Sequence, residues 1–216
     1  MCDGIWALRL VEVIERVTRK IAPGPAPSFN EAHVVKALEI IGKCGIVGRI
    51  RLSKELGLGE GTTRTLLKHL KNEGITRSSR SGISFSEEGK KLFSDLRSKL
   101  SEGVEVPSSP LTVGPFNIAI LVRDSAQAVG SGMEQRDIAI KSGASGATTL
   151  VFSGNKLSMP TGEQNVSECL PMLHDELVTK INPKENDVII VGSGENRKLA
   201  EIGAKMAAIK LLKNNN

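Results

Sequence analysis

The sequence has no tyrosine, and aromatic residues make up only 3% of its 216 residues. Its hydrophobic cores must therefore consist mainly of aliphatic side chains. It also has no apolar run that approaches the roughly 20 residues of a membrane-spanning helix. Acidic residues interrupt the amphipathic N-terminus, so that segment does not fit a secretory signal. We expect a cytoplasmic protein with no membrane partner.

Cysteine is scarce, and its three copies, Cys2, Cys44 and Cys169, form no CxxC pair. The sequence therefore suggests neither a disulfide framework nor a zinc site. Cys169 has no basic neighbour in sequence that would activate its thiol, and it fits a small buried hydrophobe better. His174 and Asp175 are adjacent in a predicted helix and so form no preassembled triad. We expect no catalytic residue, no metal ligand and no enzyme activity, and no cofactor is indicated.

Positive charge is concentrated in the first half of the chain. The formal net charge is +5, and the window Lys43–Arg80 holds nine basic and three acidic residues. Residues 106–216, in contrast, hold eleven of each sign. A basic half joined to a neutral half suggests that only the first half meets a polyanion.

The chain opens with a predicted amphipathic helix in residues 1–22, which precedes a separate domain in residues 28–101. The helix has apolar residues at helical spacing and ends at the proline-rich stretch APGPAPS; its stripe consists of Leu10, Ile14, Val17 and Ile21. Asn30 can cap the next helix, with His33 at the third helical position. The domain then follows the order helix, short strand, helix, helix, hairpin and helix, with the strand in GIVGRI (45–50) and the hairpin in residues 75–86.

The glycine-rich turn GLGEG (57–61) is the most informative stretch of this domain. A Walker phosphate loop would need a lysine after its glycines, and GLGEGTTR has none. The turn instead joins two short helices, as in a helix-turn-helix. Leu66, Leu67 and Leu70 form an inward stripe on the second helix, and Thr63 is assigned to the core. His69 borders the outward face, where it either contacts phosphate or is solvated.

We therefore predict double-stranded DNA as a partner of residues 28–101. The predicted contacts lie before the turn, on the second helix and near the hairpin tip, and are Arg51, Gly61, Thr62, Arg64, Thr65, Lys68, Lys71, Arg77 and Arg80. The alternative is that these cations form an ordinary solvated face. The ordered set of helices, glycine turn and basic hairpin favours DNA binding.

The runs RLSKELGLGEGTTRTLLKHLKNEGI and RSGISFSEEGKKLF make residues 30–100 resemble a winged helix-turn-helix domain. The whole chain is similar to a group of archaeal two-domain proteins with this N-terminal domain and an uncharacterised C-terminal domain. In the second half the segment GMEQRDIAIKSGASGATTLVF carries the similarity. The resemblance implies a transcription regulator with a small two-layer α+β second domain, and it implies no ligand.

The second half follows a predicted linker, residues 101–115, which is rich in proline, serine and glycine. Residues 116–213 alternate strand and helix patterns in the order βαββαβα. We expect one small sheet with helices packed largely on one face. The fold class is therefore α+β, with an N-terminal winged helix-turn-helix followed by a small two-layer α+β domain that binds an effector.

Two glycine segments in the second half suggest where that effector binds. Each is predicted at a turn from a strand to a helix, where backbone N–H groups favour an anion or a polar ligand edge. The candidate residues are Arg123, Gly130, Ser131, Gly132, Arg136, Gly192, Ser193 and Gly194. A small anionic or polar metabolite is the ligand class this suggests. The alternative is that each GSG makes only a tight turn.

Three functions remain open from the sequence. The first is a sequence-specific transcription regulator whose C-terminal domain senses a ligand or mediates oligomerisation. The second is a metabolic enzyme that carries a winged helix, because archaeal riboflavin kinases also join one to a second domain; residues 116–213, however, show no extended β-barrel pattern. The third is a protein-interaction factor. For the regulator we expect a homodimer that reads two half-sites, with the N-terminal helix in the dimer interface.

Overall fold

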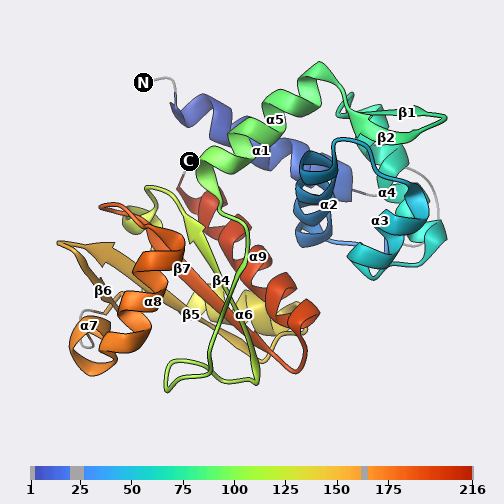
Figure 1. Ribbon diagram of the computed structural model, residues 1–216. Coiled ribbons are helices and arrows are strands. Elements are labelled where there is room, and N and C mark those ends of the chain that lie inside the picture. The colour runs from blue at the N-terminus through green and yellow to red at the C-terminus, as the bar shows by residue number, and fades with distance from the viewer. Residues whose placement is uncertain (1–2, 20–26, 162–164, 216) are drawn as a thin grey trace. The chain divides into compact units, whose positions relative to one another are not determined.

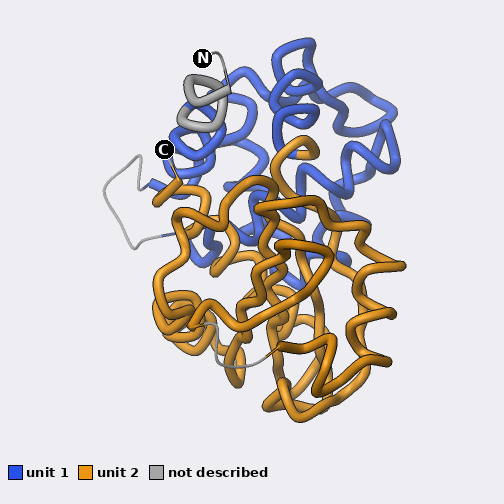
Figure 2. Tube along the Cα trace, turned by 90° about the vertical axis from the view of Figure 1, so that its left-hand side faces the viewer, with its two compact units in different colours: residues 1–96 blue, residues 97–216 orange. Residues whose placement is uncertain are grey.

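The structure, a computed structural model, describes residues 3–19, 27–161 and 165–215. The chain divides between Leu96 and Arg97 into a first unit, residues 1–96, and a second unit, residues 97–216 (Figure 2). The first unit is mainly helical, whereas the second contains a five-stranded sheet (Figure 1). The predicted α+β class, with a winged helix-turn-helix followed by an α+β domain, is confirmed.

The first unit has the element order that the sequence predicts. Its helices are α1 (Asp3–Thr18), α2 (Glu31–Cys44), α3 (Arg49–Leu56), α4 (Glu60–Asn72) and α5 (Glu87–Lys99), the last of which continues past the division between the units. Its hairpin consists of β1 (Thr76–Ser79) and β2 (Gly82–Phe85), paired antiparallel. The expected strand in residues 45–50 shrinks to a single bridge between Val47 and Ile83, because α3 already begins at Arg49.

Local signals in the sequence explain where α2, α3 and α4 begin and end. The predicted cap of α2 is present, since the Asn30 side chain accepts from the His33 N–H. Gly57 (φ +63°) ends α3 and Gly74 (φ +73°) follows α4, both in the left-handed region that glycine tolerates best. Thr63 is fully buried in α4, as predicted.

Helix α1 packs against α2 and α4 within its own unit. Its residues Leu10, Ile14 and Val17 are each at most 1% exposed, so the apolar stripe is already covered in the single chain. The prediction that this stripe contributes to a dimer interface is therefore wrong. The helix also ends at Thr18, and Ile21 lies outside the described residues.

His69 joins α4 to the end of α1. Its Nδ1 lies 2.7 Å from the Val17 carbonyl oxygen, which accepts the hydrogen bond, and Phe29 meets its ring edge-on. Both expected roles for His69, phosphate contact and solvation, are wrong because the ring is buried. On the surface beside it, Arg16 of α1 donates from Nε to Glu73 at 2.9 Å. Helix α1 is thus a structural part of the first unit.

The second unit is built on a fully antiparallel sheet with the strand order β3-β4-β7-β5-β6. The strands are β3 (Val104–Val106), β4 (Phe116–Val122), β5 (Gly146–Ser153), β6 (Lys156–Ser158) and β7 (Val188–Gly194). The segment predicted as a linker, residues 101–115, therefore supplies an edge strand, because Val104–Val106 pair with Asn117–Ala119. The remaining elements are η1 (Ala126–Ala128), α6 (Met133–Lys141), α7 (Val166–Cys169), α8 (Pro171–Ile181) and α9 (Arg197–Asn214).

Helices cover both faces of this sheet. Helices α6 and α9 pack on one face, where a side chain at Gly192 would meet α9. Alternate strand residues such as Leu121 and Ile189 point to the other face, where they share a core with Leu177 and Ile181 of α8. Figure 1 shows α8 and α9 on opposite sides of the sheet. Of the helices expected largely on one face, α8 is the exception.

Close contact between α9 and β7 depends on glycine. A Cβ atom at Gly192 would lie 2.4 Å from the Ala200 carbonyl oxygen and 2.8 Å from the Ala204 side chain. Those two alanines are fully buried in α9. Small residues on both elements thus allow the helix backbone to approach the central strand.

Replacing Gly192 with alanine should therefore destabilise the second unit by about 1–3 kcal/mol, the usual cost of overpacking. Denaturant unfolding monitored by circular dichroism measures this. Gly130→Ala is the matched control, because a Cβ atom at that exposed glycine meets nothing within 4 Å. Equal stability of the two variants would show that α9 shifts away from β7 without cost.

Candidate nucleic-acid interface

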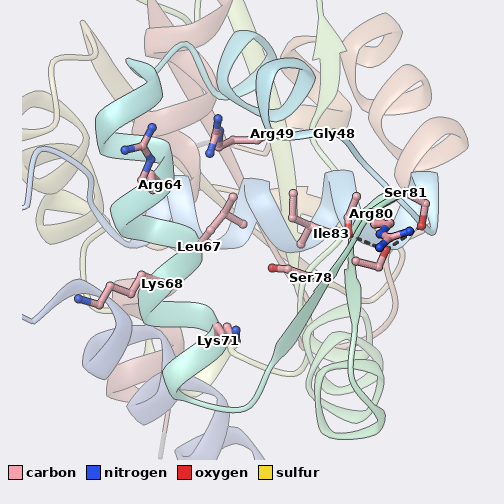
Figure 3. Close-up of a pocket in the computed structure, with 12 residues that line it drawn as sticks. Gly48, Arg49, Arg64, Leu67, Lys68, Lys71, Ser78, Arg80, Ser81 and Ile83 are labelled. Atoms are coloured by element: carbon pink, nitrogen blue, oxygen red, sulfur yellow. Dashed lines mark hydrogen bonds between the residues drawn. The ribbon is translucent and has the colours of Figure 1, made fainter.

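A groove of about 600 Å³ lies between α3, α4 and the β1–β2 hairpin of the first unit (Figure 3). Cationic side chains reach it from all three elements: Arg49 from α3, Arg64, Lys68 and Lys71 from α4, and Arg80 from the hairpin tip. The other lining residues are Gly48, Leu67, Ser78, Ser79, Ser81, Gly82 and Ile83. We call this surface the cationic groove.

The cations of the groove have no carboxylate partner among the described residues. Among the described residues, no ion pair within 4 Å involves Arg49, Arg64, Lys68, Lys71 or Arg80. Elsewhere in the unit, Arg9 contacts Glu88, Arg16 contacts Glu73, and Lys90 contacts Glu87 at 2.9 Å. The Lys90 hydrogen bond also holds the pKa of Glu87 below its ordinary value. Five positive charges therefore lie together in the groove without a carboxylate to compensate them.

The groove combines this charge with an apolar floor and hydroxyl groups. Leu67 is half-buried and Ile83 is buried, and Figure 3 shows both between the cations of α4 and the hairpin tip. At the tip, the hydroxyl groups of Ser79 and Ser81 lie 2.7 Å apart, and Ser79 donates to the Gly82 carbonyl oxygen at 3.1 Å. Such hydroxyls and cations are the side chains that contact phosphate in DNA complexes.

Four of the predicted DNA contacts converge on the groove: Arg64, Lys68, Lys71 and Arg80. Gly61 and Thr65 are exposed on α4, and Thr62 is half-buried there, but none of the three lines the groove. The Thr65 hydroxyl donates back to the Gly61 carbonyl oxygen at 3.2 Å.

Two predicted contacts, Arg51 and Arg77, lie outside the groove and have partners within the protein. Arg51 Nε donates to Glu55 at 2.7 Å, and this hydrogen bond is the main cause that raises the pKa of Arg51. Arg77 lies opposite Ser84 within the hairpin, not near its tip, and its guanidinium contacts Glu87 at 3.7 Å. Both side chains remain largely exposed, but their charges are partly compensated.

Arg49 is the groove residue that the sequence analysis missed. It stands in GRIR two positions before Arg51, and residues 45–50 were expected to form a strand. The structure instead begins α3 at Arg49, after the N-cap Gly48, and this places Arg49 in the groove. The signal was available, because a glycine before a basic residue fits a helix start as well as a strand.

The second unit does not have the predicted pair of glycine turns. Gly192, Ser193 and Gly194 lie inside β7, paired with β4, and Gly192 and Ser193 also pair with β5. They are not at a strand-to-helix turn, so their N–H groups are not free at a helix start. Ser193 instead donates to Asn117 Oδ1 at 2.7 Å inside the sheet.

The other predicted ligand residues are separated from that segment. Gly132 (φ +81°) precedes α6 beside Thr149 and Pro160, and Gly130, Ser131 and Arg136 are exposed. Arg123 forms an ion pair within the protein. Its Nη1 lies 2.6 Å from Asp187 Oδ2, and Asp187 is 2% exposed. Asp187 also accepts from the backbone N–H groups of Asp124 and Lys184. Arg123, a candidate ligand contact, thus already has a carboxylate partner within the protein.

Other chemically reactive residues of the described chain form no assembled site. Cys169 is exposed, contrary to the expectation of a buried thiol, and Cys44 is half-buried. His174 Nδ1 lies 3.1 Å from the carboxylate of Asp175, its neighbour in α8. Within the described ranges, no group of three or more His, Cys, Asp or Glu could hold a metal ion. None of the described helices is long and apolar enough to cross a membrane.

Comparison with known proteins separates the two halves in the same way. Residues 34–100 match the family described as CggR N-terminal DNA binding domain, and residues 113–211 match a domain of unknown function, DUF4443. A solved structure, of a hypothetical protein from Pyrococcus horikoshii, is 29% identical to the chain with a TM-score of 0.65. The match covers 83% of this chain and 92% of that one. No curated protein matches the chain at a significant level.

The geometry around Arg123 yields a stability prediction. Arg123→Ala should lower the free energy of unfolding by about 1–3 kcal/mol, because it removes one partner from the buried Asp187 carboxylate. Thermal unfolding of the full chain measures this. Arg136→Ala is the control, since Arg136 is exposed and such surface changes usually stay within about 0.5 kcal/mol. An Arg123→Ala variant as stable as the control would contradict the structural role.

Proposed function

We propose that the protein is a transcription regulator that binds double-stranded DNA through the cationic groove. The observation that carries this proposal is the set of five uncompensated cations on α3, α4 and the hairpin tip. Unpaired cations on one surface attract a polyanion and release its counterions. The match of residues 34–100 to a DNA-binding regulator domain supports the same function.

The shape of the interface favours a helix in the major groove. Helix α4 has Arg64, Thr65 and Lys68 exposed, with Leu66 and Leu70 buried on the opposite side. In a helix-turn-helix, the second helix lies in the major groove and the first contacts the backbone. We assign these roles to α4 and α3, and Arg80 at the hairpin tip to a phosphate contact.

The scarcity of aromatic residues favours a duplex over a single strand. Proteins that bind single-stranded nucleic acid stack its bases on exposed aromatic side chains. In the described part of the first unit, Phe29 and Phe85 are buried, Phe93 is half-buried, and none of them lines the groove. The groove therefore offers charge and hydroxyl groups but no stacking surface.

Glycines at the edge of the interface also support close approach by an outside molecule. Gly48 and Gly59 precede α3 and α4 with ordinary backbone angles, φ −75° and −62°. A Cβ atom at either position would meet nothing within 4 Å of the protein. Neither the backbone conformation nor internal packing requires glycine there. A DNA backbone lying against the two helix starts would require it.

We propose further that the second unit supplies regulation, either by binding a small ligand or by forming a homodimer. The near-equal numbers of basic and acidic residues in its sequence and its separate core support a role other than DNA contact. A dimer that reads two half-sites would use a surface other than the stripe of α1, which is already covered. The exposed residues Gly130, Ser131 and Arg136 remain candidates for contact with a small anionic or polar metabolite.

Regulation would appear as reciprocal coupling. A metabolite that changes DNA affinity must have its own affinity changed by DNA to the same factor. Light scattering of the full chain at several concentrations tests the dimer, and a monomer at every concentration with and without DNA would exclude it.

The DNA assignment predicts distinct effects of individual cations. Arg64→Ala and Lys68→Ala should each weaken binding of the native site, by about 1–3 kcal/mol if the lost contact is a bidentate base contact. Arg80→Ala should weaken binding to all sequences and make the slope of log affinity against log salt shallower by about one unit. Fluorescence anisotropy on duplex DNA at several salt concentrations measures both.

The control and the contradicting result come from the same series. Arg51→Ala removes an equal charge that is hydrogen-bonded to Glu55 and lies outside the groove, so its effect should be smaller. A triple variant, Arg64→Ala with Lys68→Ala and Arg80→Ala, should lose specific binding. Unchanged affinity of that triple variant would refute the assignment. If the wild type shows no salt-dependent binding of duplex DNA, a protein-interaction role would be favoured instead.

A further inference from the structure

Glu60 is an acidic residue on α4, one helical turn before Arg64, and it does not itself line the cationic groove. It is the first residue of α4 and is exposed. Its neighbours Gly59 and Gly61 leave open space around it, since a Cβ atom at either would meet nothing within 4 Å. The start of a recognition helix is the part that contacts base edges.

The carboxylate of Glu60 is not engaged inside the protein. Among the carboxylates within the described ranges 9–19 and 27–96, Glu60 alone has no hydrogen bond or ion pair. The others have partners: for example, Glu55 contacts Arg51, Glu73 contacts Arg16, and Glu87 contacts Lys90. Arg64 stands four residues further along α4, the favourable spacing for an ion pair, yet no such pair within 4 Å forms. The charge is therefore available to an outside partner.

A free carboxylate on a DNA-binding face has few partners. It accepts hydrogen bonds and donates none, and phosphate groups offer no donor and repel it. In the major groove, cytosine presents its N4 amino group as a donor without an adjacent acceptor. Adenine presents a donor too, but next to its N7 acceptor, which disfavours a carboxylate. Cytosine is thus the base that suits Glu60.

We infer that Glu60 is a specificity-determining residue that accepts a hydrogen bond from the N4 amino group of a cytosine in each half-site. The inference rests on the proposed DNA-binding function. Glu60 favours cytosine through its hydrogen bond. It also disfavours every other base at that position, because its carboxylate would then be desolvated and unpaired. It therefore weakens binding to unrelated DNA, which the five cations of the groove would otherwise favour.

Selection of binding sites from a random duplex library, with the full chain, tests this inference. The wild type should enrich cytosine at one position of each half-site. Glu60→Ala should lose that preference, so that the discrimination against other bases there falls by about 5- to 150-fold, the range of one good base contact. Its affinity for random duplex DNA should be equal to or higher than that of the wild type. Glu60→Gln should accept adenine beside cytosine, because an amide pairs with N6 and N7 of adenine.

A matched control separates base reading from a structural effect. Glu31 is the first residue of α2, a helix with no residue in the groove, so Glu31→Ala removes an equal charge from a helix start that makes no proposed DNA contact. Its selected sites should match those of the wild type. If Glu60 only stabilised the start of α4, Glu60→Ala would lower the melting temperature and leave the selected bases unchanged.

The outcomes distinguish this inference from the proposed function. Identical base preferences in the wild type and Glu60→Ala would overturn the inference and leave DNA binding intact. The absence of an enriched cytosine in the wild-type sites would overturn it as well. A wild type that enriches no sequence from the duplex library would contradict the proposed function itself.

Discussion

The first unit holds five cations on one surface without a carboxylate to neutralise them. Its core has to offset the repulsion between these charges. Two like charges about 10 Å apart in water repel by about 0.4 kcal/mol, so a set of five costs up to a few kcal/mol before salt screens it. Burial of Leu66 and Leu70 on the inner side of α4 contributes about 1.5–3 kcal/mol each, which is enough to offset that repulsion. Burial in the aliphatic core therefore offsets the repulsion between the concentrated charges.

Helix α1 adds to the apolar burial that offsets this charge repulsion. Its apolar stripe covers α2 and α4, and its last turn is joined to α4 through His69 and Arg16. These contacts fix the end of α4 that lies away from the glycine turn. The bridge between Val47 and Ile83 joins the hairpin to the segment that precedes α3. Arg64 and Arg80 thus belong to two elements that are each held by contacts within the unit, as the proposed recognition of a duplex requires.

The second unit follows a different physical rule, close packing of a helix on a central strand. Gly192 and Gly194 lie in β7 where α9 approaches, and their N–H groups belong to a strand instead of a helix start. Asp187 and Arg123 form a partly buried pair that joins the end of β4 to the start of β7. The segment GSG 192–194 and Arg123, which look like ligand-site residues in the sequence, thus serve the fold.

The sequence by itself determined the order of elements in the first unit, because helical spacing, glycine after helices and the Asn30 cap are local signals. It also indicated Arg64, Lys68 and Lys71 as groove cations, since residues spaced by three and four share one face of α4, and the predicted hairpin placed Arg80 near its tip. Only the tertiary structure decided which cations stay free: Arg51 and Arg77 have carboxylate partners, whereas Arg49 has none within the described chain. Only it decided that His69 is buried, that β3 belongs to the sheet and that GSG 192–194 lies within a strand. Pairing and burial depend on segments far apart in sequence, and periodicity along one segment contains no information about them.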